Sequence, residues 1–318
     1  MKRRTLIFCI LFAGTILHAQ DKSIKDMQSA TNATNKKDPN DTIPARWKTG
    51  GLFNLTFNQA ALSNWSTGGE PTALSLAATL YAYAFWKEGR HSWDNTINLA
   101  LGGNYTTSQG VRKTDDRIDL LSKYGYELSK KWFLSTLFNF RSQFAAGRAY
   151  PKDAPPVLTS DFLSPAYILL SEGLNYKPND NFSFFISPTT VRWLIVKDDS
   201  LASVGAFGVD SGKNVKTEFG AFASISYAKK FSETLAYVGR VDFFSNYLHD
   251  PQDIDINVTN LLAVKVAQWL AITFQLNLAY DNDIKTVNSD GTVGGPKLQL
   301  QELFGIGISL KFQHRTSY

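Results

Sequence analysis

Histidines and paired carboxylates are the residues of this sequence that could activate water. His249 is followed directly by Asp250, and two further acidic pairs stand at Asp115-Asp116 and Asp198-Asp199. A carboxylate beside a histidine can serve as a general base toward water. Acidic residues are also common in solvated turns, where they have no catalytic role. A surface hydrolase that uses these carboxylates and His249 is therefore the alternative interpretation, and we predict no catalytic residue.

Lipase and metal chemistry find less support in the sequence. A serine lipase needs a histidine beside a serine at membrane depth, but His91, His249 and His314 all lie outside the middle of any apolar run. Asp281, Asn282 and Asp283, with Asp290, offer oxygen ligands of the kind that calcium accepts, yet their spacing differs from the helix-loop-helix calcium motif. We expect no metal and no cofactor.

A third group of polar residues recurs at every second position of several segments. In an extended strand such residues share one face, so they would line a common interior. They would form either a polar channel whose mixed charges favour neither ion sign, or a network of ion pairs that fills the interior. Long side chains of both signs stand on facing segments, so we favour the filled interior. The set is Asp94, Thr96, Asn98, Arg117, Asp119, Lys123, Glu127, Asn139, Arg141, Asn257, Lys265, Gln275, Asn277 and Gln299.

Strands are the elements that would position these residues. Between 298 and 312 apolar side chains alternate with small or polar ones, and the segment 270–280 repeats this pattern. Strict alternation over such lengths predicts strands and not helices. Weaker runs of the same kind bring the number of predicted strands to twelve. They span 51–59, 72–86, 91–105, 118–128, 132–142, 165–177, 181–195, 217–228, 235–248, 254–266, 270–280 and 298–312.

The number of strands decides which medium meets the apolar face. Twelve strands would enclose more volume than their own side chains can fill if the apolar face pointed inward. Turning that face outward to lipid, and closing the sheet so that no backbone edge is left unpaired, resolves the problem. Trp86, Trp93, Trp132 and Trp269 stand near strand ends, where interfacial aromatic girdles lie. We predict an all-β, transmembrane, up-and-down antiparallel barrel of about twelve strands.

The connections between predicted strands alternate in length. Long connections are predicted at 60–71, 106–114, 143–164, 196–216 and 281–297, with 249–253 as a short exception. Short turns are predicted at 87–90, 129–131, 178–180, 229–234 and 267–268. Outer-membrane barrels have long outer loops and short periplasmic turns, so we expect both chain ends on the periplasmic side.

The first 46 residues are expected to lie outside the barrel, which would occupy 47–318. Residues 1–19 combine a basic start, an apolar run and a small residue at a cleavage site, as secretory signals do. Residues 20–46 are too polar to bury a core and are predicted to be a disordered periplasmic lead-in. Without the signal, 30 basic residues face 28 acidic ones, a balance of +2 that gives no reason to expect a nucleic-acid partner. The single cysteine, Cys9, lies in the signal, so no disulfide is expected.

An ordered set of short motifs resembles a known family. The set resembles the uncharacterised outer-membrane β-barrel family called domain of unknown function 3078. The resemblance implies barrel architecture and location in the cell outer membrane, but it brings no activity or catalytic residue. The motifs are SNWSTGG at 63–69, SWDN at 92–95, KTDD at 113–116, SKYGY at 122–126, FLSPAY at 162–167, YKPNDNF at 176–182, GAFGVD at 205–210 and FSNY at 244–247.

Together these patterns predict an exported, non-enzymatic outer-membrane barrel, either an envelope component or a narrow, porin-like pore for small solutes. The expected partners are outer-membrane lipid, lipopolysaccharide and the barrel-assembly machinery.

Overall fold

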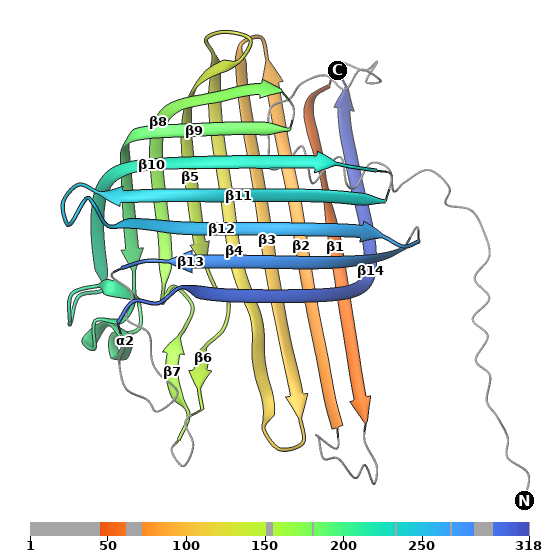
Figure 1. Cartoon of the computed structure of the whole chain (residues 1–318), viewed down its shortest axis with the longest axis vertical. Helices are drawn as coiled ribbons and strands as arrows, with labels where there is room; N and C mark the ends of the chain where they lie inside the picture. Colours follow the sequence, from red (N-terminus) through yellow and green to blue (C-terminus); the bar gives the residue numbers. More distant parts are fainter. Residues whose placement is uncertain are drawn as a thin grey trace, which may run out of the picture.

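The structure is a computed structural model that describes residues 45–61, 72–150, 155–179, 181–232, 234–267, 269–282 and 295–317. Within these residues twelve strands pair edge to edge and close into one antiparallel barrel, which confirms the predicted fold class (Figure 1). The expected signal at 1–19, and all of the expected lead-in except 45 and 46, lie outside the described residues. The barrel strands are β1 (Ala45–Ala61), β2 (Thr72–Glu88), β3 (His91–Thr106), β4 (Gly110–Glu127), β5 (Trp132–Ser142), β8 (Ala166–Asn179), β9 (Phe182–Ile195), β10 (Val215–Lys230), β11 (Leu235–Asn246), β12 (Ile254–Lys265), β13 (Leu270–Tyr280) and β14 (Gln299–Ser317).

One contact across the barrel shows which face of each strand points inward. Arg141 on β5 donates a hydrogen bond of 3.2 Å to Asp242 on β11, although β5 and β11 are not neighbours in the ring. Both side chains therefore point inward. Since side chains alternate between the two faces of a strand, β5 turns exposed Leu134 and Phe138 outward and buried Asn139 inward. An apolar exterior around a polar interior is the arrangement of a transmembrane barrel.

The two rims of the barrel differ in the length of their connections. The short-turn rim carries the turns 89–90, 128–131, 180–181, 231–234 and 266–269, together with the start of β1 and the end of β14. At the opposite, long-loop rim the described connecting residues are 143–150, 155–165, 196–214, 247–253, 281–282 and 295–298, and residues 62–71, 151–154 and 283–294 lie outside the described ranges. In Figure 1, β8 to β14 cross steeply in front of β1 to β5, because the strands of a closed barrel tilt against its axis.

The predicted long loop at 106–114 is wrong. β3 continues to Thr106 and β4 begins at Gly110, which leaves only the turn 107–109. Tyr105 pairs with Val111 and Thr106 with Gly110, so the ladder runs on to its end. β4 pairs with β5 only from Ile118 onward, and the β3–β4 hairpin therefore projects beyond β5 at the long-loop rim.

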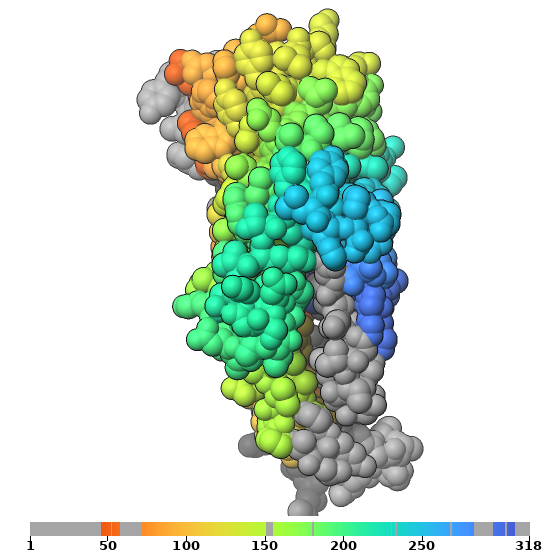
Figure 2. Space-filling view, turned by 90° about the vertical axis from the view of Figure 1, so that its left-hand side faces the viewer, coloured from red at the N-terminus to blue at the C-terminus, as the bar shows by residue number. Residues whose placement is uncertain are grey.

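The connections at the long-loop rim contain short elements of their own. β6 (Gly147–Ala149) and β7 (Val157–Ser160) form a separate two-stranded sheet. The β9–β10 connection contains α2 (Asp199–Ser203) and the 3-10 helix η1 (Ala206–Gly208). In the space-filling view this connection and the bluer β11–β12 connection lie on the same side of the molecule (Figure 2). No helix among the described residues is long and apolar enough to cross a membrane.

Two carboxylates of the described strands interrupt the apolar exterior. Glu302 of β14 is exposed and pairs in register with outward-facing Leu276 of β13. Glu172 lies midway along β8, is exposed, and stands opposite Thr136 of β5. Its outward-facing neighbours along β8 are Leu170 and Leu174, both exposed. An ionisable side chain at mid-depth in hydrocarbon is costly, so this position lowers the stability of the barrel in a bilayer.

Candidate functional site in the barrel lumen

A network of charged side chains crosses the lumen between β4, β5 and β11. Asp242 accepts hydrogen bonds from Arg141 at 3.2 Å and from Arg240 at 2.7 Å. Arg141 also lies 3.6 Å from a carboxylate oxygen of Asp119. Asn139 donates a hydrogen bond of 2.7 Å to the same carboxylate. The network pairs each charge with an opposite one, as burial requires.

A second group of charges surrounds Arg192 of β9 nearer the long-loop rim. Its guanidinium group pairs with Glu218 of β10 and, at 2.6 Å, with Asp255 of β12. Because β9 and β12 are not neighbours in the ring, this contact also crosses the lumen. Lys216 lies 3.0 Å from Glu218, and the guanidinium carbon of Arg192 lies 4.1 Å from the centre of the Phe244 ring.

Inward-facing apolar side chains fill much of the space between these charges. They form one buried cluster in which each member comes from a different strand, with Leu121 of β4 packed against it. We call β4, β5, β8, β9, β10 and β11 the packed wall, because ion pairs and this cluster occupy the lumen along them. The buried members of the cluster are Leu137, Leu169, Phe185, Phe222 and Phe244.

The opposite side of the lumen, formed by β12, β13 and β14, is less filled, and we call it the open wall. Thr259 is in register with inward-facing Arg240, and Gln301 with inward-facing Asn277, so both side chains point inward. Both are nevertheless exposed. An inward side chain that is exposed borders space that protein atoms do not fill. Hydrogen bonds join amides along this wall, since Asn277 donates to Gln301 at 2.9 Å and Gln275 to Asn277 at 3.2 Å.

Strand register places all the predicted interior residues on inward-facing positions. The structure brings some of them into contact and leaves others apart. Asp119, Asn139 and Arg141 contact one another, as do Gln275 and Asn277. The predicted residues are Asp94, Thr96, Asn98, Arg117, Asp119, Lys123, Glu127, Asn139, Arg141, Asn257, Lys265, Gln275, Asn277 and Gln299.

Near the short-turn rim the inward-facing charges are mainly lysines. Asp94 is buried and stands opposite Lys123. Lys87 lies 3.6 Å from Glu127, and Lys177 is almost fully buried. This end of the lumen therefore combines several ammonium groups with few carboxylates.

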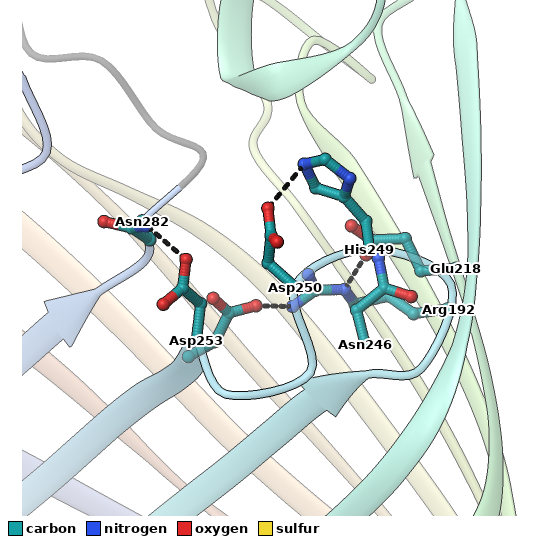
Figure 3. A pocket seen from close by; sticks show the side chains of 8 residues that line it. Arg192, Glu218, Asn246, His249, Asp250, Asp253 and Asn282 are labelled. Atoms are coloured by element: carbon teal, nitrogen blue, oxygen red, sulfur yellow. Dashed lines mark hydrogen bonds and ion pairs between the residues drawn. The ribbon is translucent and has the colours of Figure 1, made fainter.

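A small pocket opens at the long-loop rim (Figure 3). His249 lies 3.1 Å from Asp250, and both side chains are well exposed, at 66% and 52%. Asn282 donates a hydrogen bond of 2.5 Å to Asp253 on the other side of the pocket. The remaining lining residues include Arg192, whose carboxylate partners form part of the lumen network. The rim thus holds one histidine–carboxylate contact, the feature on which the hydrolase alternative depends.

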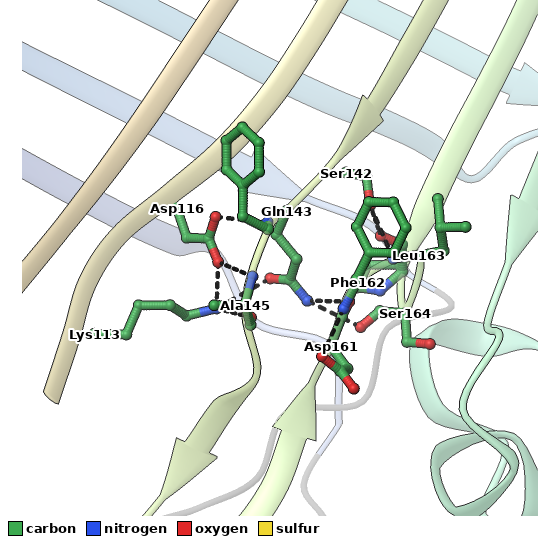
Figure 4. A network of polar contacts seen from close by, with 11 residues as sticks. Lys113, Asp116, Ser142, Gln143, Ala145, Asp161, Phe162, Leu163 and Ser164 are labelled. Atoms are coloured by element: carbon green, nitrogen blue, oxygen red, sulfur yellow. Dashed lines mark hydrogen bonds and ion pairs between the residues drawn. The ribbon is translucent and has the colours of Figure 1, made fainter. Parts of the chain in front are cut away.

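The acidic pair at 115–116 is engaged elsewhere in the structure (Figure 4). Asp116 accepts hydrogen bonds from the backbone N–H groups of Phe144 at 2.7 Å and Ala145 at 2.9 Å. Lys113 lies 3.0 Å from the same carboxylate. Gln143 donates to the carbonyl oxygen of Asp161 at 2.7 Å. These contacts fix both ends of the β5–β8 connection to the rim.

The acidic pair at 198–199 caps and fastens the β9–β10 connection. Asp198 is the N-cap of α2 and accepts hydrogen bonds from the backbone N–H groups of Ser200 and Leu201. The hydroxyl of Ser200 also donates to this carboxylate, and these bonds hold the pKa of Asp198 below its usual range. Asp199 accepts a hydrogen bond of 3.1 Å from Asn214. Neither acidic pair joins the His249 pocket.

The predicted alternative of a calcium site falls partly on undescribed residues, since Asp283 and Asp290 lie outside the described ranges. Among the residues that the structure describes, no group of three or more histidine, cysteine or acidic side chains is arranged to hold a metal ion.

Comparison of the sequence with known protein families found one match. A family model described as "Protein of unknown function (DUF3078)" matches residues 57–147. The predicted resemblance is confirmed. The matched stretch runs from β1 to β6 and includes Lys123, Asn139 and Arg141 of the lumen. No match was found among curated proteins.

Several solved barrels are distantly similar in structure. An outer membrane channel from Pseudomonas putida F1 aligns over 88% of this chain and 100% of its own, with 11% identity and a TM-score of 0.38. The NanC porin covers 83% and 100%, with 8% identity and a TM-score of 0.39. The translocator domain of autotransporter NalP from Neisseria meningitidis covers 92% and 95%, with 9% identity and a TM-score of 0.40. The barrel assignment rests on the strand pairing of this chain.

Several lumen residues were missed by the sequence patterns. Lys48 and Lys87 lie just outside the predicted strands 51–59 and 72–86, whereas Lys177 is the last residue of the predicted strand 165–177 and β8 continues beyond it to Asn179. Arg192 and Glu218 lie within predicted strands but were not assigned to a face. Extending the alternation by up to three residues beyond the apolar runs would have found Lys48 and Lys87, and alternation within 165–177 would have found Lys177.

Proposed function

We propose that this protein is an outer-membrane β-barrel that gives small polar solutes a narrow passage along its open wall. The apolar exterior suits contact with outer-membrane lipid and lipopolysaccharide, and insertion by the barrel-assembly machinery. The packed wall occupies one side of the lumen with ion pairs and an apolar cluster. The proposal makes the protein a narrow pore and not a wide channel.

The observation that carries the proposal is the exposure of Thr259. This side chain points into the lumen from the middle of β12, opposite Asn277, and it is nevertheless exposed. On the packed wall, inward residues such as Asn139 and Phe222 are buried. A continuous space beside β12, β13 and β14 accounts for both facts, and its amide and hydroxyl lining suits hydrated solutes.

Conductance of the refolded protein in a planar bilayer tests the proposal. Thr259→Trp places a large ring in the passage, and we expect its conductance to fall by about half or more. Val258→Trp, on the outward face of the same strand, is the matched control and is expected to leave conductance unchanged. Phe222→Ala removes a ring from the packed wall and is expected to raise conductance.

A folded wild-type protein that shows no conductance would overturn the proposal. Folding is checked separately by the shift in gel mobility between unheated and boiled samples. Equal loss of conductance in the Thr259 and Val258 variants would show that the passage does not follow the open wall.

A further inference from the structure

We propose that the β3–β4 hairpin carries a binding site for small acidic zwitterions, molecules that have two carboxylates and one ammonium group. Arg112, Asp115 and Arg117 of β4 form the site on the inward face of the hairpin, next to the long-loop rim. All three precede Ile118, where the pairing of β4 with β5 begins. They therefore lie closer to the rim than Leu121, the residue of β4 that packs against the apolar cluster. The site does not rest on the proposed passage, because a solute reaches it from the long-loop rim.

Strand register places Asp115 and Arg117 on the inward face of β4. Asp119 lies beside Arg141 in the lumen, so it points inward. Arg117 and Asp115 precede it by two and four positions without a break in the ladder, and side chains two positions apart in a strand share a face. Asp115 is buried, with 9% of its surface exposed. A carboxylate and a guanidinium group are thus next to each other on the inward face.

A β-bulge brings Arg112 onto the same face. Between Asp115 and Lys113, β4 contains one residue more than the facing segment of β3. The extra residue turns Arg112 inward, opposite Asn104, and places Lys113 on the outward face. Bulges often redirect a side chain beside a functional site. Along the inward face the charges then alternate as positive, negative and positive.

These three charged groups do not neutralise one another. The ion pairs of this part of β4 involve Lys113 and Asp119. Among the described residues, none is formed by Arg112, Asp115 or Arg117. Both arginines are partly exposed, so a solute can reach them. The sequence therefore places three charges on one face of the hairpin and leaves them available to a ligand.

Buried polar atoms without hydrogen-bond partners gather at the same place. They include the Nε atoms of Arg112 and Arg117. The amide oxygen of Asn104 and the hydroxyl oxygen of Thr106, on the inward face of β3, are also buried and without a partner. Buried polar atoms nearly always have a partner. A ligand with several polar groups accounts for this concentration of unpaired donors and acceptors.

Tyr150 fixes the orientation of one guanidinium group. The guanidinium carbon of Arg112 lies 3.5 Å from the centre of the Tyr150 ring, so the ring covers one face of the group. Stacking of this kind leaves the N–H donors at the edge of the guanidinium plane available. Those donors match a carboxylate through two parallel hydrogen bonds.

The alternation of charges determines the class of ligand. Arg112 and Arg117 each match a carboxylate, and Asp115 between them matches an ammonium group. Successive inward positions of a strand lie about 7 Å apart, and arginine side chains are long enough to converge on a small molecule beside Asp115. A molecule with two carboxylates and one ammonium group, such as an acidic amino acid, neutralises all three groups.

Calorimetric titration of the refolded protein in detergent micelles tests the site. L-glutamate carries all three charged groups, glutarate lacks the ammonium group, and γ-aminobutyrate lacks one carboxylate. We expect glutamate to bind about tenfold or more tightly than either analogue, because each analogue leaves one charge of the site unmatched. These titrations use the wild-type protein, so they do not depend on the folding of a variant.

Asp115→Asn separates recognition of the ligand from a structural role. The variant is expected to bind glutamate about tenfold more weakly and to lose the preference for glutamate over glutarate, because the ammonium group loses its partner. Asp253→Asn removes a carboxylate from the β11–β12 connection at the same rim. It is the matched control and is expected to keep both the affinity and the preference. Folding of both variants is checked by the gel shift between unheated and boiled samples.

Three results would overturn the site. They are the absence of glutamate binding to folded wild-type protein, equal affinity for the three compounds, and a preference for glutamate over glutarate that persists in Asp115→Asn. None of these results changes the conductance expected along the open wall, which the Thr259 variant tests separately.

Discussion

Replacing Asp242 by asparagine removes the charge that joins two sides of the lumen. The Asp242 side chain is only 7% exposed and accepts hydrogen bonds from Arg141 at 3.2 Å and Arg240 at 2.7 Å. Asp242→Asn leaves two guanidinium groups, 33% and 16% exposed, without their shared carboxylate. Losing one partner of a buried ion pair costs about 3–5 kcal/mol. Asp119 stays within 3.6 Å of Arg141, so we expect the lower end of that range, about 3 kcal/mol.

Urea unfolding in lipid vesicles, followed by the mobility difference between folded and unfolded protein on unheated gels, measures this loss. The urea concentration at the unfolding midpoint is expected to fall. The slope of the unfolding free energy against urea concentration is expected to stay the same, because the surface exposed on unfolding does not change. Asp119→Asn is the matched control. Its side chain is 25% exposed and its contact with Arg141 is longer, so its loss is expected to be about 1 kcal/mol. A loss from Asp242→Asn no larger than that of the control would refute the reasoning.

Three further predictions concern the exterior and the sidedness of the barrel. Phe274→Arg is expected to cost about 2–4 kcal/mol because it meets hydrocarbon and pairs in register with Phe304 and Leu262, whereas Gln275→Arg on the inward face is expected to be mild. Equal unfolding midpoints would show that the faces are assigned wrongly. An epitope inserted at Ser108, in the β3–β4 turn, is expected to be labelled by antibody on intact cells. An epitope at Gly89 is expected to be labelled only after the outer membrane is permeabilised. The reverse labelling pattern would show that the topology is inverted. Glu172→Leu is expected to raise the free energy of unfolding in vesicles by about 1 kcal/mol, because it removes an ionisable group at mid-depth; a fall would mean that the carboxylate has a stabilising partner.

The sequence was sufficient for the barrel, and alternation assigns each strand residue to one of its two faces. Arg141 and Lys123 could be assigned to the interior because alternation needs no knowledge of distant contacts. The pairing of Arg141 with Asp242 could not be predicted, because the two residues are 101 positions apart and meet only through the curvature and stagger of the closed sheet. The preference for a filled interior describes the packed wall but not the open one, where Thr259 is exposed.

The extent of the strands was harder to predict than their existence. The charged segment at 113–116 resembles a loop in composition, yet β4 runs through it, with a register shift opposite Gly102 and Gly103 that accommodates an extra residue. Lys48 and Lys87 were missed for a related reason, since hydrogen-bonded pairing continues beyond the apolar band that hydropathy detects. Backbone pairing depends on the neighbouring strand and not on side-chain polarity.

The contact between Arg141 and Asp242 also constrains how the barrel can fold. It joins strands separated by three others in one direction around the ring and by more in the other, so a partly built sheet lacks it. Contacts between residues far apart in sequence carry a high entropic cost before they form and slow folding. Until the ring closes, Asp242 has Arg240 of its own strand and Ser224 of neighbouring β10 as partners, and the open sheet gains nothing from the pair with Arg141. The contact between Arg141 and Asp242 therefore stabilises only the completed ring. Folding of the packed wall becomes more cooperative, because an unclosed sheet has its backbone pairing but lacks this contact.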